Sequence, residues 1–273
     1  MLFETKKMKA DELGKIRWLD DDYSGKFSYL KTQAKNKTLL WYNNTLLLWV
    51  FPADIITSFR EVYIMTFMFQ GSHLKHFFEL NSIAYDLYHI AKDECKICSG
   101  IQDLREEKKK IASMLNVYQG CLNDIGDKET ALSKSWYEDN CKNGLAKEVS
   151  NNAYNFLYNK VKARVDHALY TTFAAMKKRY PVRDYAGAFI PCNLRATNQF
   201  KDRTCLCYLI NVYDNPYIKQ YFADFGITVD QDAIALNQLL QWVWRSAIMD
   251  GKPVNLYIPS RRMRSLLINW LVA

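Results

Sequence analysis

The stretch that decides the fold is ALNQLLQWVWRSAIMDGKPVNLYIPSRRMRSLLINWL, residues 235–271. Its first half carries an apolar stripe at helical spacing, made of Leu236, Leu239, Leu240, Val243 and Ala247. Gly251 and Pro253 end that helix, and residues 254–258 alternate as a short strand. Ser260 can cap a second helix, whose apolar face is Met263, Leu266, Leu267, Trp270 and Leu271. The stretch therefore predicts a helix, a strand and a second helix of an α/β fold.

A different stripe of the first helix carries Gln238, Gln241, Arg245 and Met249. Because this stripe does not coincide with the apolar one, Gln241 and Arg245 need not serve the core. Both side chains are therefore candidates for contact with a ligand.

Three arginines, Arg261, Arg262 and Arg264, occupy the first turn of the second helix. The helix macrodipole disfavours cations there by about 0.3–1 kcal/mol each when they are exposed. A phosphate bound by the free N–H groups of this turn would reverse the sign of that effect. The cluster therefore predicts a phosphate-binding helix start, with a solvated basic turn as the alternative.

Upstream, apolar runs alternate with helical segments. Residues 188–191, 206–213 and 227–229 predict strands, and residues 218–225 predict a short helix. This alternation is typical of a mainly parallel sheet with helices on both faces. The loop after the first of these strands carries Asn193, Arg195, Thr197 and Asn198, where open α/β sheets bind ligands.

The middle of the chain, residues 101–180, is predicted to be helical. Its longest predicted helix spans residues 155–180 and has an apolar side made of Phe156, Val161, Val165, Leu169 and Phe173. Its remaining surface carries Lys160, Lys162, Arg164, Lys177, Lys178 and Arg179. Such a helix either follows a phosphate backbone or only keeps the protein soluble.

Two apolar runs near the N-terminus, residues 46–51 and 62–69, predict strands, with a short helix over residues 53–60 between them. Thr66 lies in the second run. It is either an ordinary β-former of a core strand or a polar group at a functional loop.

Composition narrows the class of protein. The chain has 273 residues, 49% of them hydrophobic, which excludes overall disorder and allows one large or two modest domains. Its formal charge of +8 favours a polyanionic partner, for which DNA or RNA is the natural candidate. The charged N-terminus lacks a signal peptide, and the uncharged run of residues 38–53 is too short to span a bilayer. We therefore expect a soluble cytoplasmic protein with no membrane partner.

The seven cysteines are an odd number in a chain without export features, which favours reduced thiols. Cys192, Cys205 and Cys207 lie in or near predicted strands and are expected in the core. Cys95 and Cys98 form a Cys-x-x-Cys pair, but the cysteines that follow, Cys121 and Cys141, are too widely spaced for a standard zinc knuckle. We therefore predict no metal site and keep a zinc-stabilised module as an alternative.

Three segments resemble motifs of superfamily-2 DEAD/DEAH-type helicases. Gln241 and Arg245 resemble the last helicase motif, in which a Gln and one or two arginines of the second RecA-like lobe face the nucleotide. NLRATN at 193–198 and the apolar run after it resemble the preceding loop and strand. VYIMTFMF at 62–69 is similar to the strand and Thr-containing loop that couple ATP hydrolysis to strand movement. The segments follow the family order, and the likeness is to diverged helicase-like proteins of phages and mobile elements.

The chain also departs from that pattern. It has no Gly-x-x-x-x-Gly-Lys-Ser/Thr run and no Asp-Glu-x-His motif, so a phosphate cradle and a magnesium carboxylate are missing. Met249 stands about where the family supplies a second arginine, and a thioether cannot stabilise a phosphoryl transition state. The chain therefore resembles the C-terminal part of a helicase without the ATP-binding half.

The resemblance implies a RecA-like fold in three parts: a partial first lobe over residues 1–95, a helical insertion or linker over 96–180, and a second lobe over 181–273. It implies that Arg245 contacts the γ-phosphate, that Gln241 orients it and that Thr66 links the lobes. ATP and Mg²⁺ would then be bound only with a partner polypeptide that carries the Walker motifs, and not by the isolated chain.

The nucleic-acid backbone would be held by five side chains: Arg195, Asn198, Arg261, Arg262 and Arg264. The first functional hypothesis is accordingly a helicase-like nucleic-acid-binding protein that is complemented by a partner. The second is a non-enzymatic phage or plasmid protein that keeps the fold and the basic surface without ATP chemistry. The third is the zinc-stabilised interaction module built on Cys95 and Cys98.

Overall fold

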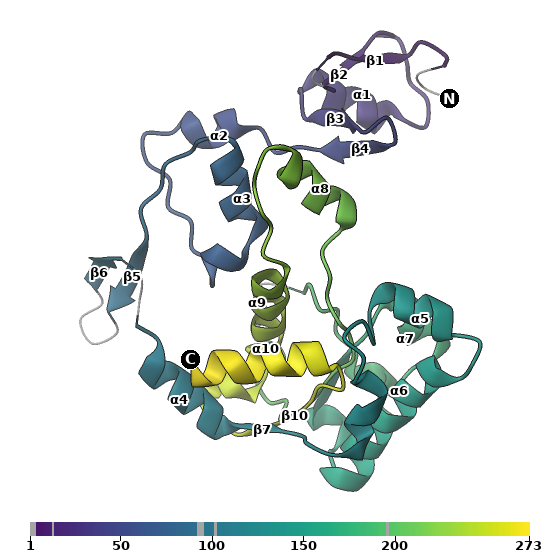
Figure 1. Cartoon of the computed structure of the whole chain (residues 1–273), viewed down its shortest axis with the longest axis vertical. Helices are drawn as coiled ribbons and strands as arrows, with labels where there is room; N and C mark the ends of the chain where they lie inside the picture. The colour runs from purple at the N-terminus through teal and green to yellow at the C-terminus, as the bar shows by residue number, and fades with distance from the viewer. Residues whose placement is uncertain (1–3, 13, 92–95, 101–102, 195–196) are drawn as a thin grey trace. The chain divides into compact units, whose positions relative to one another are not determined.

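The computed structural model describes residues 4–12, 14–91, 96–100, 103–194 and 197–273 (Figure 1). They form two compact units. The first, here the N-terminal unit, comprises residues 1–65 and 80–83; the second, here the sheet unit, comprises residues 66–79 and 84–273. Each unit has a hydrophobic core of its own. No helix among the described residues is long and apolar enough to cross a membrane.

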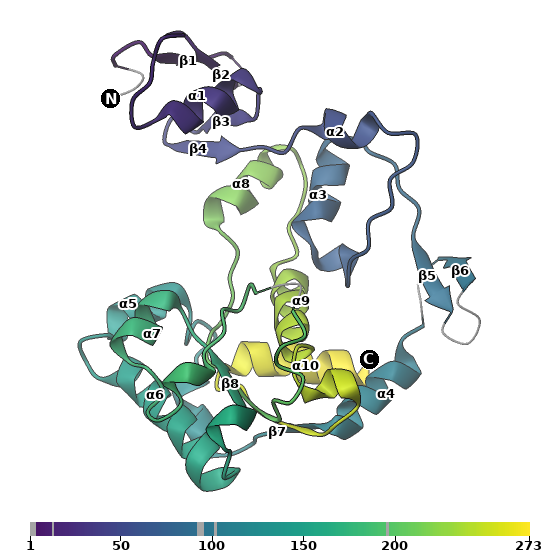
Figure 2. The same ribbon diagram turned by 180° about the vertical axis from the view of Figure 1, so that it is seen from behind.

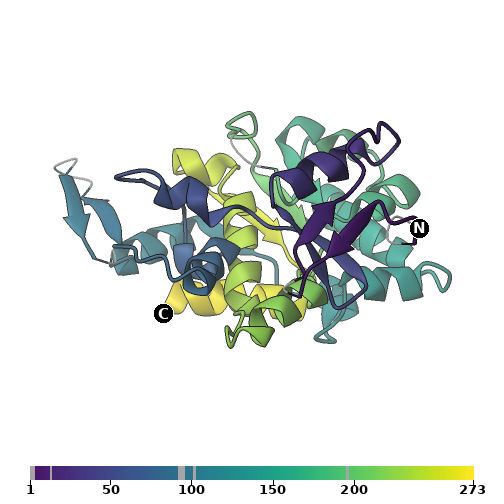
Figure 3. The same cartoon turned by 90° about the horizontal axis from the view of Figure 1, so that it is seen from above.

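The N-terminal unit is built from two antiparallel strand pairs and two helices, and its first part is seen in purple in Figure 3. Its elements are β1 (Met8–Ala10), β2 (Ile16–Trp18), α1 (Ser28–Lys35), β3 (Leu39–Tyr42), β4 (Leu46–Trp49) and α2 (Ala53–Thr57). Asn43, Asn44 and Thr45 connect β3 to β4, and the two asparagines have φ of +47° and +53°, the left-handed conformation that Asn tolerates. The core holds Met8, Ile16, Trp18, Leu30, Ala34 and Leu39.

The sheet unit contains the remaining elements. Its strands are β5 (Tyr88–Ala91), β6 (Lys96–Ser99), β7 (Leu115–Val117), β8 (Ala168–Thr171), β9 (Cys205–Tyr208) and β10 (Val254–Tyr257). Its α-helices are α3 (His73–Leu80), α4 (Arg105–Met114), α5 (Lys134–Asn140), α6 (Leu145–Asn155), α7 (Ala174–Arg179), α8 (Pro216–Asp224), α9 (Gln231–Val243) and α10 (Arg261–Val272). Its short helical turns are η1 (Phe69–Gly71), η2 (Cys121–Gly126), η3 (Phe156–Lys160), η4 (Val165–His167), η5 (Ala186–Ala188) and η6 (Ala247–Asp250).

Four strands form one parallel sheet in the order β7-β10-β9-β8. The last strand along the chain, β10, lies between the first and third, with Leu256 opposite both Val117 and Leu206. β8 pairs in parallel with β9 and is the outer strand opposite β7. Because all four strands run in the same direction, their carboxyl ends lie together, here called the carboxyl edge, and their amino ends lie together on the opposite side, here called the amino edge.

The two faces of the sheet are buried against different helices. Cys205, Cys207 and Tyr257 face a core shared with α5 and α6. Leu206, Tyr208 and Leu256 face the opposite core, shared with α9 and α10. Figures 1 and 2 show α5, α6 and α7 grouped together, apart from α4, α9 and α10. Because both faces are covered, β8, β9 and β10 consist almost entirely of buried residues, whereas the edge strand β7 is only partly buried.

The predicted α/β class and the parallel sheet are confirmed. In the deciding stretch the strand and the second helix form as predicted, but the first helix, α9, ends at Val243 and not at Gly251, so Arg245 follows it and Met249 lies in η6. β10, α8 and α10 lie close to their predicted bounds. Ser260 caps α10, since its hydroxyl accepts a hydrogen bond from the Met263 N–H at 3.4 Å. Cys205 and Cys207 are buried in β9, as expected.

The predicted helix over residues 155–180 is wrong. The segment begins with the end of α6 and the π-helical turn η3, and it then contains the buried edge strand β8 and the short helix α7. Lys162 adopts a left-handed φ of +47°, which an α-helix excludes. The middle region thus contributes two strands, β7 and β8, to the sheet, so it is more than a helical insertion ending at residue 180.

Other predicted strands also differ. Residues 61–66 form no helix or strand, and Tyr63 and Met65 are 78% and 96% exposed, so this run is not a buried strand. Residues 227–229 form no strand, and residues 188–191 give only a single bridge, from Phe189 to Tyr170. In the described part of residues 1–95 the strand pairings are antiparallel, unlike the parallel sheet of a RecA-like lobe.

Candidate functional site

The carboxyl edge of the sheet is the usual ligand position in open α/β folds, and here part of it is filled. The chain leaves β7 and β10 toward opposite faces, which is the arrangement that opens a crevice between neighbouring strands. Gly126, at the end of η2, fills the crevice between β7 and β10. A Cβ on Gly126 would lie 2.0 Å from the Pro259 carbonyl oxygen, so no side chain fits between them.

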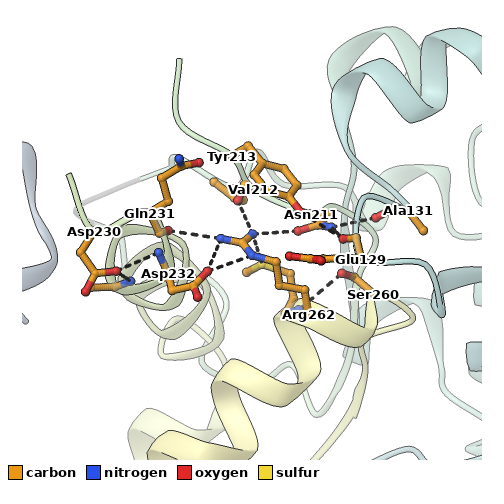
Figure 4. Close-up of polar contacts among 12 residues, drawn as sticks. Glu129, Ala131, Asn211, Val212, Tyr213, Asp230, Gln231, Asp232, Ser260 and Arg262 are labelled. Atoms are coloured by element: carbon orange, nitrogen blue, oxygen red, sulfur yellow. Dashed lines mark hydrogen bonds and ion pairs between the residues drawn. The ribbon is translucent and has the colours of Figure 1, made fainter. Parts of the chain in front are cut away.

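Arg262 closes the same edge beyond β9 (Figure 4). Its guanidinium donates to Asp232 Oδ1 at 2.6 and 2.9 Å, to Asn211 Oδ1 at 2.9 Å and to the Val212 carbonyl at 2.7 Å. The ring of Tyr213 lies 4.3 Å from the guanidinium carbon. Asn211 in turn donates to the carbonyls of Glu129 and Ala131. The Arg262 side chain is only 9% exposed. Its hydrogen bonds connect α10 to Asp232 of α9 and to the segment that follows β9.

The other two arginines of this turn differ in environment. Arg264 donates to the carbonyls of Ile258 and Pro259 at 2.8 and 2.9 Å, and burial lowers the pKa of its guanidinium. Arg261 is exposed. Acceptors of the chain itself therefore surround Arg262 and Arg264, so these two cations do not need the external anion that was expected from the sequence. Arg261 remains open to solvent.

A cavity of about 1000 Å³ at the amino end of the sheet collects most of the other predicted site residues. Thr66, Asn198, Gln241 and Arg245 all line it, although they come from three distant parts of the sequence. The loop that follows α9 belongs to this edge, since the Ala247 N–H donates to the carbonyl of Arg203, just before β9. The predicted catalytic residues thus share one cavity, on the edge opposite the one that open α/β folds ordinarily use.

The wall that carries Thr66 is held to α9 by a buried amide. Asn237 donates to the Gly71 carbonyl at 2.9 Å, and its Oδ1 accepts from Gln241 Nε2 at 2.7 Å. Gly71 approaches α9 closely, since a Cβ there would lie 2.6 Å from the Ala233 carbonyl oxygen. Gln241 therefore has a structural contact in addition to its place at the cavity.

The rest of the cavity wall is mixed in character. Trp244 and Met249 are 42% and 41% exposed. Hydrogen bonds from the Arg105 side chain hold the pKa of Asp103 at about 2, so both remain charged at neutral pH. Apolar surface with a few charged groups is the usual lining of a small-molecule site.

Two predicted positions cannot be placed, because Arg195 and Cys95 lie outside the described residues. Cys121 is exposed, while Cys141 is buried with its Sγ 3.8 Å from the Met176 sulfur. Across the described ranges no three His, Cys, Asp or Glu side chains come together as metal ligands. The absence of a metal site remains a prediction.

The positive charge of the chain is more strongly concentrated than the motifs of the sequence indicated. Residues 154–203, here the basic segment, contain ten lysines and arginines against three aspartates, a surplus of seven within the whole chain's +8. Most of these side chains are exposed: Lys160, Lys162, Arg164, Lys177, Lys178, Arg179, Arg183 and Lys201. Summing the charge along the sequence identifies the segment. The predicted helix over residues 155–180 instead placed these cations on the surface of one helix.

Known proteins resemble the chain over nearly its whole length. Residues 109–271 match the family described as the YonV C-terminal Rossmann-like domain, and residues 1–49 match the YonV middle domain. The SPbeta prophage-derived uncharacterized protein YonV of Bacillus subtilis (strain 168) is 38% identical over 281 residues, covering 99% of this chain and 68% of that protein. No solved structure matches. The Rossmann-like match agrees with the parallel sheet and begins well before residue 181.

Proposed function

The chain belongs to the YonV family, whose C-terminal domain is Rossmann-like, and we propose that it is a nucleic-acid-binding protein that acts through its basic segment. We place this activity in a phage, because the B. subtilis relative is prophage-derived. In this proposal the isolated chain carries out no ATP hydrolysis.

One observation carries the proposal: seven of the eight surplus positive charges fall within residues 154–203. In the fold this segment surrounds the edge strand β8, from the end of α6 through α7 to the start of β9. Among its exposed cations, Lys177, Lys178 and Arg179 share one short helix. Phosphates contacted by such cations release counterions, which makes binding strongly dependent on salt.

The salt dependence tests this proposal. Replacing Lys177 and Lys178 together with Gln should reduce the logarithmic salt slope for a labelled single strand by about 1.4, at about 0.7 per phosphate contact. The matched control replaces Lys219 and Lys252, two exposed lysines outside the basic segment, and should leave the slope unchanged. Fluorescence anisotropy at several salt concentrations measures both. Absence of binding at low salt, or equal slopes for the two variants, would refute the proposal.

A second candidate function follows from the amino-edge cavity and from the resemblance to helicases. Thr66, Gln241 and Arg245 line one space that is large enough for a nucleotide. In this candidate a partner polypeptide with the Walker motifs presents ATP and Mg²⁺ to that cavity, and Arg245 contacts the γ-phosphate.

The isolated chain is expected to show no ATP turnover, because it has no P-loop lysine and no carboxylate motif for Mg²⁺. A coupled ATPase assay with Mg²⁺ and single-stranded DNA measures this. Turnover in the range of about 1–100 s⁻¹, abolished by Arg245→Ala, would show that the chain contains a complete site and would contradict the expectation.

A further inference from the structure

A second cavity, here the β8 cavity, lies within the basic segment beside the edge strand β8. Its volume is about 640 Å³, within the range of small-molecule sites. Its wall includes Tyr158 of η3, Arg164, Leu169 of β8 and Arg203, the residue before Thr204 and β9. Of these residues, only Arg164 was named from the sequence as a possible phosphate contact.

Arg203 supplies a donor without an acceptor. Its Nε is buried, and no atom of the described residues accepts a hydrogen bond from it. The only contact its side chain makes there as a donor is a long one, from Nη1 to the Val165 carbonyl at 3.4 Å. A buried guanidinium nitrogen left unpaired is costly, and charge-assisted hydrogen bonds from arginine favour phosphate oxygens. Arg203 as a whole is only partly buried and lines the cavity, so the outer N–H groups of its guanidinium can donate to an anion bound there.

Tyr158 supplies an aromatic surface beside that donor. Its ring stacks on Tyr154 with centroids 5.3 Å apart and planes only 9° apart, yet Tyr158 is 57% exposed. The Arg183 guanidinium lies 5.4 Å from the Tyr154 ring and extends the stack. The π-helical turn η3 places Tyr158 at the cavity, and such turns occur often at functional sites.

The charges at the rim point to the same class of ligand. Arg164 forms an ion pair with Asp166 at 2.8 Å, and Arg183 lies 3.5 Å from Asp184, so both aspartates have cationic partners. Lys160 and Lys162, exposed in the turn before Arg164, have no carboxylate partner among the described ion pairs. The surroundings of the cavity are thus cationic on balance.

From these observations we infer that the β8 cavity binds one nucleotide unit of a single strand, with its base stacked on Tyr158 and its phosphate bound by Arg203. This inference rests on the proposed function and names the substrate class as single-stranded nucleic acid. A duplex keeps its bases paired and stacked inside, so its bases cannot use Tyr158. The same chemistry would also accept a free nucleoside monophosphate, and the experiment separates the two sources.

The experiment compares a labelled oligo-dT strand of about ten nucleotides with a duplex of the same length. Tyr158→Ala should weaken binding of the strand by about 5- to 150-fold, the loss expected for one stacked base, and should leave duplex binding unchanged. Tyr158→Phe keeps the ring and should bind the strand like the unaltered protein. The matched control is Tyr217→Ala, a tyrosine of similar exposure on α8, which should change neither affinity.

A second variant, Arg203→Met, tests the proposed phosphate contact independently of the stacking contact. It should weaken strand binding while Tm stays unchanged or rises, because the substitution removes an unpaired buried donor. A lower Tm with unchanged binding would make Arg203 a structural residue and overturn the inference. Equal losses for strand and duplex in Tyr158→Ala would overturn it as well.

The outcomes also distinguish this inference from the proposed function. If strands bind in a salt-dependent way but the Tyr158 and Arg203 variants bind equally well, the proposed function stands and the β8 cavity is not the site. If no strand binds, NMR titration with thymidine, inorganic phosphate and dTMP decides. Shifts at the β8 cavity with dTMP alone would assign it to a free nucleotide and overturn the assignment to strands, and shifts with phosphate alone would reduce it to an anion site.

Discussion

Arg262 shows what the sequence can and cannot predict about a single residue. Its place in the first turn of α10 was predictable from Ser260 and the apolar face after it. Its acceptors were not, because Asp232 and Asn211 lie 30 and 51 positions away and only the fold brings them to this turn. The same holds for Tyr158 and Arg203, which share a cavity across 45 positions. Thr66, Asn198 and Arg245 were named from the sequence, and the fold does place them at one cavity.

Replacing Arg262 with Lys should lower the free energy of unfolding by about 1–3 kcal/mol, since hydrogen bonds to a charged group contribute that much and one ammonium cannot reach the same set of acceptors. Urea unfolding followed by circular dichroism measures the change. Arg261→Lys, at the exposed neighbouring position, should stay within about 0.5 kcal/mol of the unaltered protein. Equal stability of the two variants would mean that the contacts of Arg262 add nothing to the fold.

Among the elements, those with a cap or a breaker at each end were predictable. α10 begins directly after its predicted cap, Ser260. α8 begins at Pro216, with Asn215 as its cap, two residues before its predicted start at residue 218. β8 was missed because Val161, Val165, Leu169 and Phe173 recur every four residues, as in a helix. A strand of four buried residues has too few positions to show its own period. The apolar run at 62–69 has the composition of a strand, but among the described residues no neighbouring strand pairs with it.

At the scale of the whole molecule, the sheet faces are rich in buried tyrosines. Burial raises the pKa of Tyr137, Tyr208 and Tyr257 above the ordinary value of 10.0. The phenols therefore stay protonated in the folded state at a pH at which the unfolded chain loses those protons. Above about pH 10 the unfolded state binds fewer protons than the folded state, so the free energy of unfolding falls as the pH rises. Below that pH these groups do not change how the free energy of unfolding depends on pH.

The expected fall is about 1.4 kcal/mol per pH unit for each buried tyrosine. Urea unfolding at several pH values between about 9.5 and 11.5 measures it, with tyrosinate absorbance as a second signal. Tyr257→Phe removes one of the protons, so its stability should fall less steeply with pH, whatever the substitution costs at neutral pH. Parallel curves for the two proteins would show that Tyr257 ionises equally in both states.

The position of β10 in the middle of the sheet has a consequence for synthesis on the ribosome. β7 pairs only with β10 within the sheet, and β9 needs β10 on its open side. Because translation reaches residues 254–257 after the other three strands, a nascent chain holds β7 without its neighbour and β8–β9 as an isolated pair. The sheet can therefore close only after β10 has left the exit tunnel, and strand pairing over such distances is slow. Until then the apolar residues of β8 and β9 lack part of their packing, which favours aggregation of the incomplete chain.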